Sequence, residues 1–205
     1  MVYSIDAALK SKLFHEVMVS TDSDVYADIA KNAGANVPFF RSTESSSDFA
    51  SSWDTVREVL TNYKEMGQDF DTVCLLQPTS PLRKVEDITN AYRCFSDYKA
   101  DSVIGVCEAE HSPIWINTLP KSMRMDNFVN IDAQGKGRQE LGKYYRINGA
   151  VYIVYAKTIL ENRSIYYNSI AYIMPQKRSI DIDCILDFKV AEVFLQEEER
   201  VHYRK

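Results

Sequence analysis

The chain has 205 residues, 24 basic and 29 acidic, for a net charge of −5, so it can bury one large core and lacks the positive excess typical of nucleic-acid-binding proteins. The basic run at residues 200–205 is confined to the end of the chain. No apolar stretch approaches the roughly 18 residues of a membrane span, and the first residues do not resemble a signal peptide. We expect a soluble, cytoplasmic protein that binds neither nucleic acid nor membrane.

The cysteines and histidines form no pattern typical of a disulfide framework or a metal site. No two cysteines make a C-x-x-C pair, and the histidines are far apart without ligand spacing. We expect reduced, mostly buried thiols. The cysteines are Cys74, Cys94, Cys107 and Cys184.

The spacing of apolar residues predicts helices that alternate with short strands. The expected helices cover residues 3–12, 25–33, 52–63, 86–98, 156–161 and 185–198, and the expected strands cover residues 16–19, 36–40, 73–76, 102–106 and 151–154. In the last helix, Phe188, Ala191 and Leu195 are expected to face inward. This alternation predicts an α/β fold with a mainly parallel sheet and helices on both faces. We assign residues 1–205 to one domain, with an excursion from the sheet over residues 111–146.

A stiff loop follows the buried strand at residues 73–76. Gln77 is its first polar residue, and Pro78 and Pro81 force the chain out of the sheet because proline fixes φ and removes a donor. Ser80 and Arg83 lie on the same loop. Ligands bind at this edge of open α/β sheets, although a strand that simply ends in a proline turn is the alternative.

Asp181 and Asp183 alternate with isoleucines, so an extended chain places both carboxylates on one face. Two adjacent carboxylates repel unless a cation or a shared proton relieves them, and Mg²⁺ suits such a pair together with phosphate oxygens. The alternative is a helix N-terminus, where acidic residues favour the helix dipole.

Cations and hydroxyls complete the set of candidate site residues. The guanidinium groups of Arg138 and Arg146 suit carboxylate or phosphate, and Arg146 lies at the entry to a buried strand. Surface cations on a loop are the alternative. Ser51 or Ser52 could donate to a ribose or base, although one of them is expected to be an ordinary helix N-cap.

Taken together, five stretches resemble the CMP-sialic acid synthetases, or acylneuraminate cytidylyltransferases, and their nonulosonic acid and Kdo relatives. They are Val19–Asp22, Ser45–Ser52, Leu75–Arg83, Tyr145–Ile153 and Ser179–Asp183. Their order and spacing match almost the whole chain. The resemblance implies a Rossmann-like nucleotidyltransferase sheet and the transfer of CMP from CTP to a nine-carbon α-keto acid sugar, dependent on Mg²⁺ or Mn²⁺.

The same resemblance implies roles for individual residues. Asp181 and Asp183 would hold the metal, and Gln77 would orient the sugar. Arg138 and Arg146 would meet the sugar carboxylate or the phosphates. The further substrate-binding residues that it implies are Arg41, Ser52, Ser80, Asn148 and Tyr152.

The resemblance also implies a protruding dimerisation arm within residues 111–175 and therefore a homodimer. Family members open with a strand and a glycine- and lysine-rich phosphate loop, and we expect that this chain starts downstream of both. Residues 16–19 and 73–76 would then flank the position of that strand. The alternative to a cytidylyltransferase is a non-catalytic dimeric protein that binds the sugar or the nucleotide.

Overall fold

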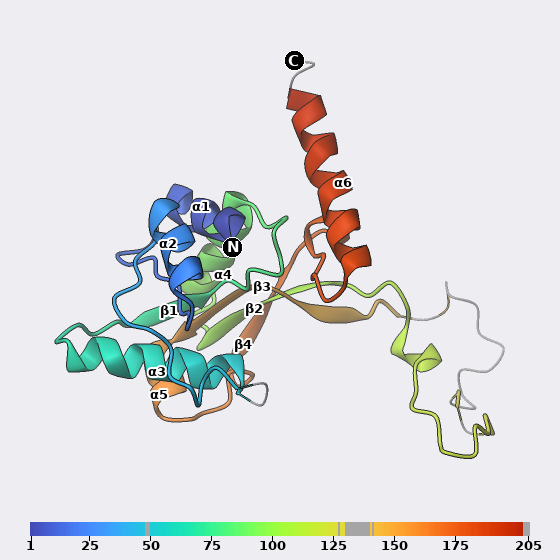
Figure 1. The fold of residues 1–205 in the computed structure, drawn as a ribbon. Coiled ribbons are helices and arrows are strands. Elements are labelled where there is room, and N and C mark those ends of the chain that lie inside the picture. Colours follow the sequence, from blue (N-terminus) through green and yellow to red (C-terminus); the bar gives the residue numbers. More distant parts are fainter. Residues whose placement is uncertain (48–49, 127, 130–139, 141, 203–205) are drawn as a thin grey trace.

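The computed structural model describes residues 1–47, 50–126, 128–129, 140 and 142–202, in which helices pack around a four-stranded sheet (Figure 1). The α-helices are α1 (Val2–Ser11), α2 (Asp24–Asn32), α3 (Ser52–Glu65), α4 (Val85–Asp97), α5 (Ala156–Leu160) and α6 (Ile185–His202). The strands are β1 (Thr72–Leu75), β2 (Ser102–Glu108), β3 (Tyr145–Tyr155) and β4 (Ser169–Ile173). Short 3₁₀ helices occur at η1 (Pro113–Trp115) and η4 (Gln176–Arg178). The predicted α/β class is confirmed.

The sheet has the strand order β1-β3-β2-β4. β3 is antiparallel to both β1 and β2, whereas β2 and β4 are parallel. Three of these four strands therefore run in one direction, as the prediction of a mainly parallel sheet requires, but the reversed strand lies between two of them. Two of the three pairings are consequently antiparallel.

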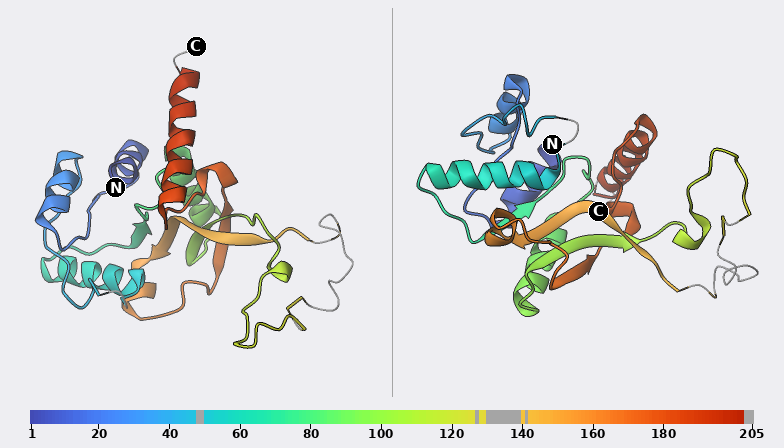
Figure 2. Two further views of the ribbon diagram at one scale, coloured as in Figure 1. Left: turned by 45° about the vertical axis from the view of Figure 1, so that its right-hand side comes forward. Right: turned by 90° about the horizontal axis from the view of Figure 1, so that it is seen from below.

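The reversed direction of β3 follows from its connection to β2. Glu108 at the end of β2 pairs with Tyr145 at the start of β3, and the Ala109 amide donates to the Tyr144 carbonyl at 2.8 Å. β2 and β3 thus form a hairpin, which makes adjacent strands antiparallel. Residues 109–144, the arm, connect the two strands, and the described part of the arm, residues 109–126, 128–129, 140 and 142–144, projects from the sheet in each view (Figures 1 and 2). The range predicted for the dimerisation arm, residues 111–175, also includes β3 and β4, which belong to the sheet, and α5, which packs on it.

Helices cover both faces of the sheet, as predicted (Figure 1). On one face, Val103 and Ile153 pack with α1 and α4. On the other, Ile104 and Val154 pack with α3 and α5. This alternation along β2 and β3 reflects the two-residue period of a strand, so both strands are buried on both sides.

The strands predicted at residues 16–19 and 36–40 are reduced to a single parallel bridge between Met18 and Asn36. The Asn36 amide donates to the Val17 carbonyl at 2.8 Å, and the Val19 amide donates to the Asn36 carbonyl at 3.0 Å. The next donor in this ladder would be residue 38, which is a proline without an N–H group, so the pairing stops there. Among the described strands β1 pairs with β3 alone, and residues 16–19 do not pair with β1 directly.

Helix α6 leads away from the sheet and projects from the body (Figures 1 and 2). Ala191 is buried, as predicted, but the prediction for Phe188 is wrong because 53% of its surface is exposed. Ile185 and Leu186 at the start of the helix are also largely exposed. Within the described residues, no helix combines the length and the apolar character needed to cross a membrane.

Candidate active site

The loop after β1 is attached to β3 by a buried arginine. Arg83 is only 4% exposed; its Nη2 donates to the Gln77 carbonyl at 2.7 Å, and its Nε donates to the Ala150 carbonyl. Burial lowers the pKa of Arg83 to about 10, although nearby Asp87 opposes the shift, so the guanidinium is charged at neutral pH. Because the prolines stiffen the loop and Arg83 anchors it, Gln77 has a fixed position at the carboxyl end of β1.

Gly149 lets the side chain of Gln77 lie directly on the backbone of β3. Its φ is +71°, and a Cβ atom there would lie 2.2 Å from Gln77 Oε1 and 3.5 Å from Asp181 Oδ2. The first distance is far below van der Waals contact, and the φ value disfavours any residue with a side chain. The absence of a side chain at position 149 therefore brings the Gln77 amide and the Asp181 carboxylate to one place.

Residues 179–183, the acidic segment, carry Asp181 and Asp183. A hydrogen bond to the loop that contains Pro78 and Pro81 holds this segment beside Gly149. The Ile182 amide donates to the Thr79 carbonyl at 2.9 Å. Asp181 is half-buried, whereas Asp183 is exposed, two residues before α6 begins at Ile185. The amides of Asp183 and Cys184 both donate to Asp187 Oδ2, at 3.1 and 2.9 Å, so Asp187 caps this helix.

A buried oxygen without a partner suggests what the acidic segment could hold. Asp181 Oδ1 is buried and accepts no hydrogen bond from the described residues. A buried carboxylate oxygen is costly without a donor or a cation, so the site fits a hard dication such as Mg²⁺. The described residues contain no cluster of three or more potential metal ligands. Asp181 and Asp183 are the side chains that could hold such an ion, and Mg²⁺ commonly takes only one or two carboxylates together with phosphate oxygens.

Arg146 lies between the acidic segment and the base of the arm. Its Nε and one Nη nitrogen donate to the two carboxylate oxygens of Glu110 at 3.0 and 2.9 Å, a bidentate pair. The same Nη2 donates to the Ser179 carbonyl at 3.1 Å. The hydrogen bonds that Arg146 donates to Glu110 raise the pKa of Arg146, with a smaller contribution from the charge of Asp181. Because Ser179 lies two residues before Asp181, the bond to the Ser179 carbonyl places Arg146 beside the segment that carries Asp181.

Asn148 is a buried link between β3 and the segment that precedes Asp181. It is 1% exposed; its Nδ2 donates to Ser179 Oγ at 2.9 Å, and its Oδ1 accepts the Ala150 amide at 3.1 Å. The hydroxyl of fully buried Ser80 donates to the Asn148 carbonyl at 3.3 Å. In this structure both side chains hold the backbone around Gly149 rather than line an open surface.

Tyr152 forms a half-buried aromatic wall on β3. Its ring meets that of Trp53 edge-to-face, with centroids 5.4 Å apart. Burial raises the pKa of the Tyr152 hydroxyl, and the charge of Asp181 adds to the effect. The hydroxyl stays protonated at neutral pH and can donate a hydrogen bond to a ligand.

The remaining predicted residues make other contacts, are exposed, or lie outside the described residues. Arg41 Nε donates to Ser20 Oγ at 3.1 Å, which fixes the loop after the bridge at Met18. Ser52 is exposed in the first turn of α3, whose N-cap is Ser51. Arg138 lies outside the described residues.

Two residues that hold the site in place were missed by sequence reasoning. Asp87 is fully buried, and its Oδ1 accepts Arg178 Nη2 at 2.8 Å, which ties η4 to the start of α4. Glu110 pairs with Arg146 as described above. The capping pattern at the start of α4, where Asp87 accepts the Lys84 amide at 3.0 Å, was a local signal for Asp87.

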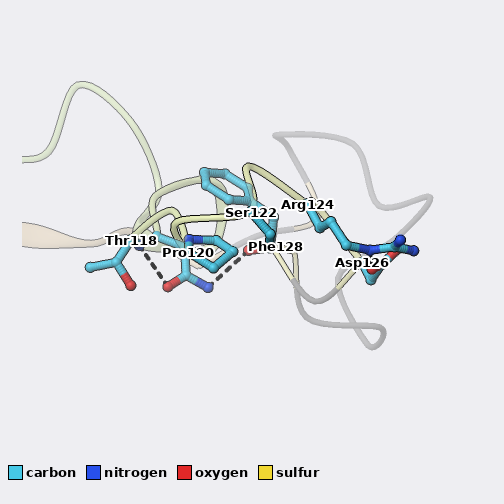
Figure 3. A pocket seen from close by; sticks show the side chains of 7 residues that line it. Thr118, Pro120, Ser122, Arg124, Asp126 and Phe128 are labelled. Atoms are coloured by element: carbon cyan, nitrogen blue, oxygen red, sulfur yellow. Dashed lines mark hydrogen bonds and ion pairs between the residues drawn. The ribbon is translucent and has the colours of Figure 1, made fainter.

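A separate hollow of about 300 Å³ lies in the arm (Figure 3). Asn117 spans it: its Oδ1 accepts the Thr118 amide at 2.8 Å, and its Nδ2 donates to the Phe128 carbonyl at 3.1 Å. The ion pair of Arg124 and Asp126 lies at its edge. It shares no lining residue with the site around Asp181 and is not part of it.

The sequence profile of the family described as "Cytidylyltransferase" matches residues 1–127, more than half of the chain. The chain belongs to the cytidylyltransferase family.

This cytidylyltransferase is also similar to named enzymes that activate sugar acids. It is 34% identical over 204 residues to a CMP-N,N'-diacetyllegionaminic acid synthase of Legionella pneumophila, covering 96% of this chain and 84% of the relative. It is 30% identical over 192 residues to a pseudaminic acid cytidylyltransferase of Campylobacter jejuni, covering 93% and 82%. An N-acylneuraminate cytidylyltransferase of Streptococcus agalactiae is 35% identical over 189 residues, which cover 91% of this chain but 44% of that longer protein.

A solved structure shares the fold. It is a CMP:2-keto-3-deoxy-manno-octonic acid synthetase complexed with CTP, which aligns with a TM-score of 0.66 at 15% identity over 95% of this chain and 87% of that chain. At this identity the likeness establishes the fold of the cytidylyltransferase and nothing finer.

Proposed function

We propose that this cytidylyltransferase transfers CMP from CTP to a nonulosonic acid, a nine-carbon α-keto acid sugar. The carrying observation is the partnerless buried oxygen of Asp181 beside the Gln77 amide and the Arg146 guanidinium. An anionic position, a neutral hydrogen-bonding group and a cation within one site suit a metal, a sugar and a carboxylate or phosphate. The names of the relatives, which act on legionaminic, pseudaminic and acylneuraminic acids, support the substrate class.

In the proposed reaction, the anomeric hydroxyl oxygen attacks the α-phosphorus of CTP, the α–β anhydride bond breaks, and pyrophosphate leaves with its electron pair. The hydroxyl proton passes to solvent. Asp181 and Asp183 would hold Mg²⁺, which lowers the pKa of the attacking hydroxyl and neutralises phosphate charge when bound. Gln77, fixed against Gly149, orients the sugar hydroxyls. Holding both reactants in line supplies much of the acceleration in such transfers.

The remaining residues suit the recognition of the sugar acid. The guanidinium of Arg146 can take a carboxylate in a bidentate pair, because its planar fork matches the two oxygens. Tyr152 offers a ring face and a protonated hydroxyl beside Asp181. Ser80 and Asn148 act through the backbone around Gly149, since both side chains are buried.

The test is a pyrophosphate-release assay with CTP, Mg²⁺ and N-acetylneuraminic, N,N'-diacetyllegionaminic or pseudaminic acid. We expect release only when both CTP and one acid are present, and a loss of about 10²–10³-fold in kcat for Asp181→Asn. The melting temperature should not fall, because the substitution neutralises a buried oxygen that lacks a partner. Asp6→Asn, at an exposed pair with Lys10, is the control. Binding of acid and CTP without release would instead favour the non-catalytic alternative.

We also propose a cytoplasmic C₂ homodimer that uses the arm. All four cysteines are free, as is usual in a reducing compartment. The arm and the segment between α5 and β4 expose large apolar side chains, a typical mark of interfaces. They are Ile116, Met123, Tyr166 and Tyr167, each at least 60% exposed. Light scattering at micromolar concentration should give twice the chain mass, and a monomer would contradict the proposal.

A further inference from the structure

Glu110 occupies the edge of Arg146 that an incoming carboxylate would use. Both oxygens of Glu110 accept from the guanidinium, at 3.0 and 2.9 Å, in the two-pronged geometry that arginine makes with carboxylates. The hairpin fixes this meeting, because Cys107 pairs with Arg146 and the Ala109 amide donates to the Tyr144 carbonyl. The register of the β2–β3 hairpin therefore places the Glu110 carboxylate against the Arg146 guanidinium.

A hollow of about 240 Å³ opens beside this pair. Its walls are mainly apolar, with Pro113, Ile116 and Tyr144 on the arm, and Glu110 and Arg146 supply its charged groups. An apolar hollow with few polar groups is typical of a small-molecule site, where the polar groups fix the orientation of the ligand. The charge that a ligand could recognise here is the guanidinium.

The pair is also exposed enough to open. The side chains of Arg146 and Glu110 are 35% and 50% exposed, and such partly solvated ion pairs contribute little to stability. Nη2 of Arg146 keeps its bond to the Ser179 carbonyl when Glu110 leaves, so the guanidinium stays close to the acidic segment. The carboxylate of a ligand can thus replace that of Glu110 without rearranging β3.

We propose that Glu110 is a positioning residue that competes with the carboxylate of the sugar acid for Arg146: it holds the guanidinium in the free protein and releases it when the acid binds, which rests on the function proposed above. A ligand with a carboxylate replaces one ion pair by another. A ligand without one leaves the Glu110–Arg146 pair in place and gains nothing from the cation. Glu110 thereby lowers the affinity for ligands that carry a carboxylate and leaves the affinity for uncharged ligands unchanged.

The experiment compares N-acetylneuraminic acid with its methyl ester by isothermal titration calorimetry, using the full chain. Removing the competing charge in Glu110→Gln should tighten binding of the acid by about fivefold and leave the affinity of the ester unchanged. Glu108→Gln is the matched control, because Glu108 lies two residues earlier, at the end of β2, and pairs with Lys143 instead, at 3.4 Å. It should bind both ligands like the parent protein.

Weaker or unchanged binding of the acid by Glu110→Gln, or equal shifts for acid and ester, would overturn the proposal. Glu110→Asp, which keeps the charge on a shorter side chain, should fall between the parent and Glu110→Gln. Pyrophosphate release, measured in parallel, separates the two ideas. Turnover without any difference between variants removes only the role of Glu110, whereas tighter acid binding without turnover removes only the proposed reaction. Absence of acid binding in every variant would reject both.

Discussion

A methyl group at Gly149 would occupy the space that the amide of Gln77 fills, 2.2 Å from its Oε1 atom. Gln77 is held from behind by the bond between its carbonyl and Arg83, so its side chain cannot move away together with the loop. The positions of the Gln77 amide and the Asp181 carboxylate therefore depend on the absence of a side chain at position 149. Substituting this position separates the placement of Gln77 from its chemistry.

We predict that Gly149→Ala lowers kcat/KM at least tenfold and destabilises the fold by about 1–3 kcal/mol, because it adds a clash to an unfavourable φ. Gly67→Ala is the control: its φ is +80°, but a Cβ atom there meets nothing within 4 Å. It should cost only the backbone strain, about 1 kcal/mol, with normal kinetics. Urea unfolding and initial rates measure both effects, and equal kinetics for the two variants would contradict the role of Gly149.

At the scale of elements, the segment between β4 and α6 is attached to the body by a buried ion pair. Arg178 on η4 contacts Asp87 on α4 at 2.8 Å and Glu86 at 2.9 Å, and the Tyr172 hydroxyl also donates to Asp87, at 3.3 Å. Asp181 follows three residues later. The start of α4 thus sets the position of the acidic segment.

We predict that Arg178→Met destabilises the fold by about 3–5 kcal/mol, because it leaves the carboxylate of Asp87 buried without its cation. Adding Asp87→Asn should recover a large part of the loss, since the buried charge is then removed. Arg124→Met, which breaks the exposed pair with Asp126, is the control and should cost less than about 1 kcal/mol. Additive losses for the pair in urea unfolding would contradict the coupling.

The helices were predictable because their apolar spacing is a local property of the chain. The strands at residues 16–19 and 36–40 were not, since a strand exists only where a partner continues the ladder, and Pro38 ends it after one bridge. The central place of β3 depends on its hairpin with β2, whose ends are separated by the whole arm. The hydrophobic periodicity of a strand does not identify which other strand will lie next to it in the sheet.

The same distinction applies to the site. Gln77, Asp181 and Arg146 could be predicted because they lie at strand ends or in a carboxylate pair, and the structure brings them together. The partners that position them could not, because Glu110 lies 36 residues from Arg146 and Asp87 lies 91 residues from Arg178. Contacts over such separations follow from the fold rather than from local pattern.

At the scale of the whole molecule, two elements project from the body, the described part of the arm and α6 (Figure 2). Both expose apolar side chains. Ile116 on the arm is 63% exposed, and Ile185 on α6 is 71% exposed. A soluble monomer rarely exposes such side chains together over a large area. Both elements are therefore surfaces that a second copy could cover, and the arm is joined directly to the strands of the site.

The hairpin that carries the arm has a consequence for regulation, because β3 holds Arg146 and Gly149 only a few residues beyond the point where the arm ends. A partner bound to the arm would contact the same hairpin that carries Arg146 and Gly149 in the proposed substrate site. By thermodynamic linkage, any effect of assembly on affinity must equal the effect of substrate on assembly. Sedimentation with and without CTP and N-acetylneuraminic acid should therefore give different dimer dissociation constants, and equal constants would contradict the coupling. In the proposed dimer, dilution alone would then change the affinity of each protomer for its substrate.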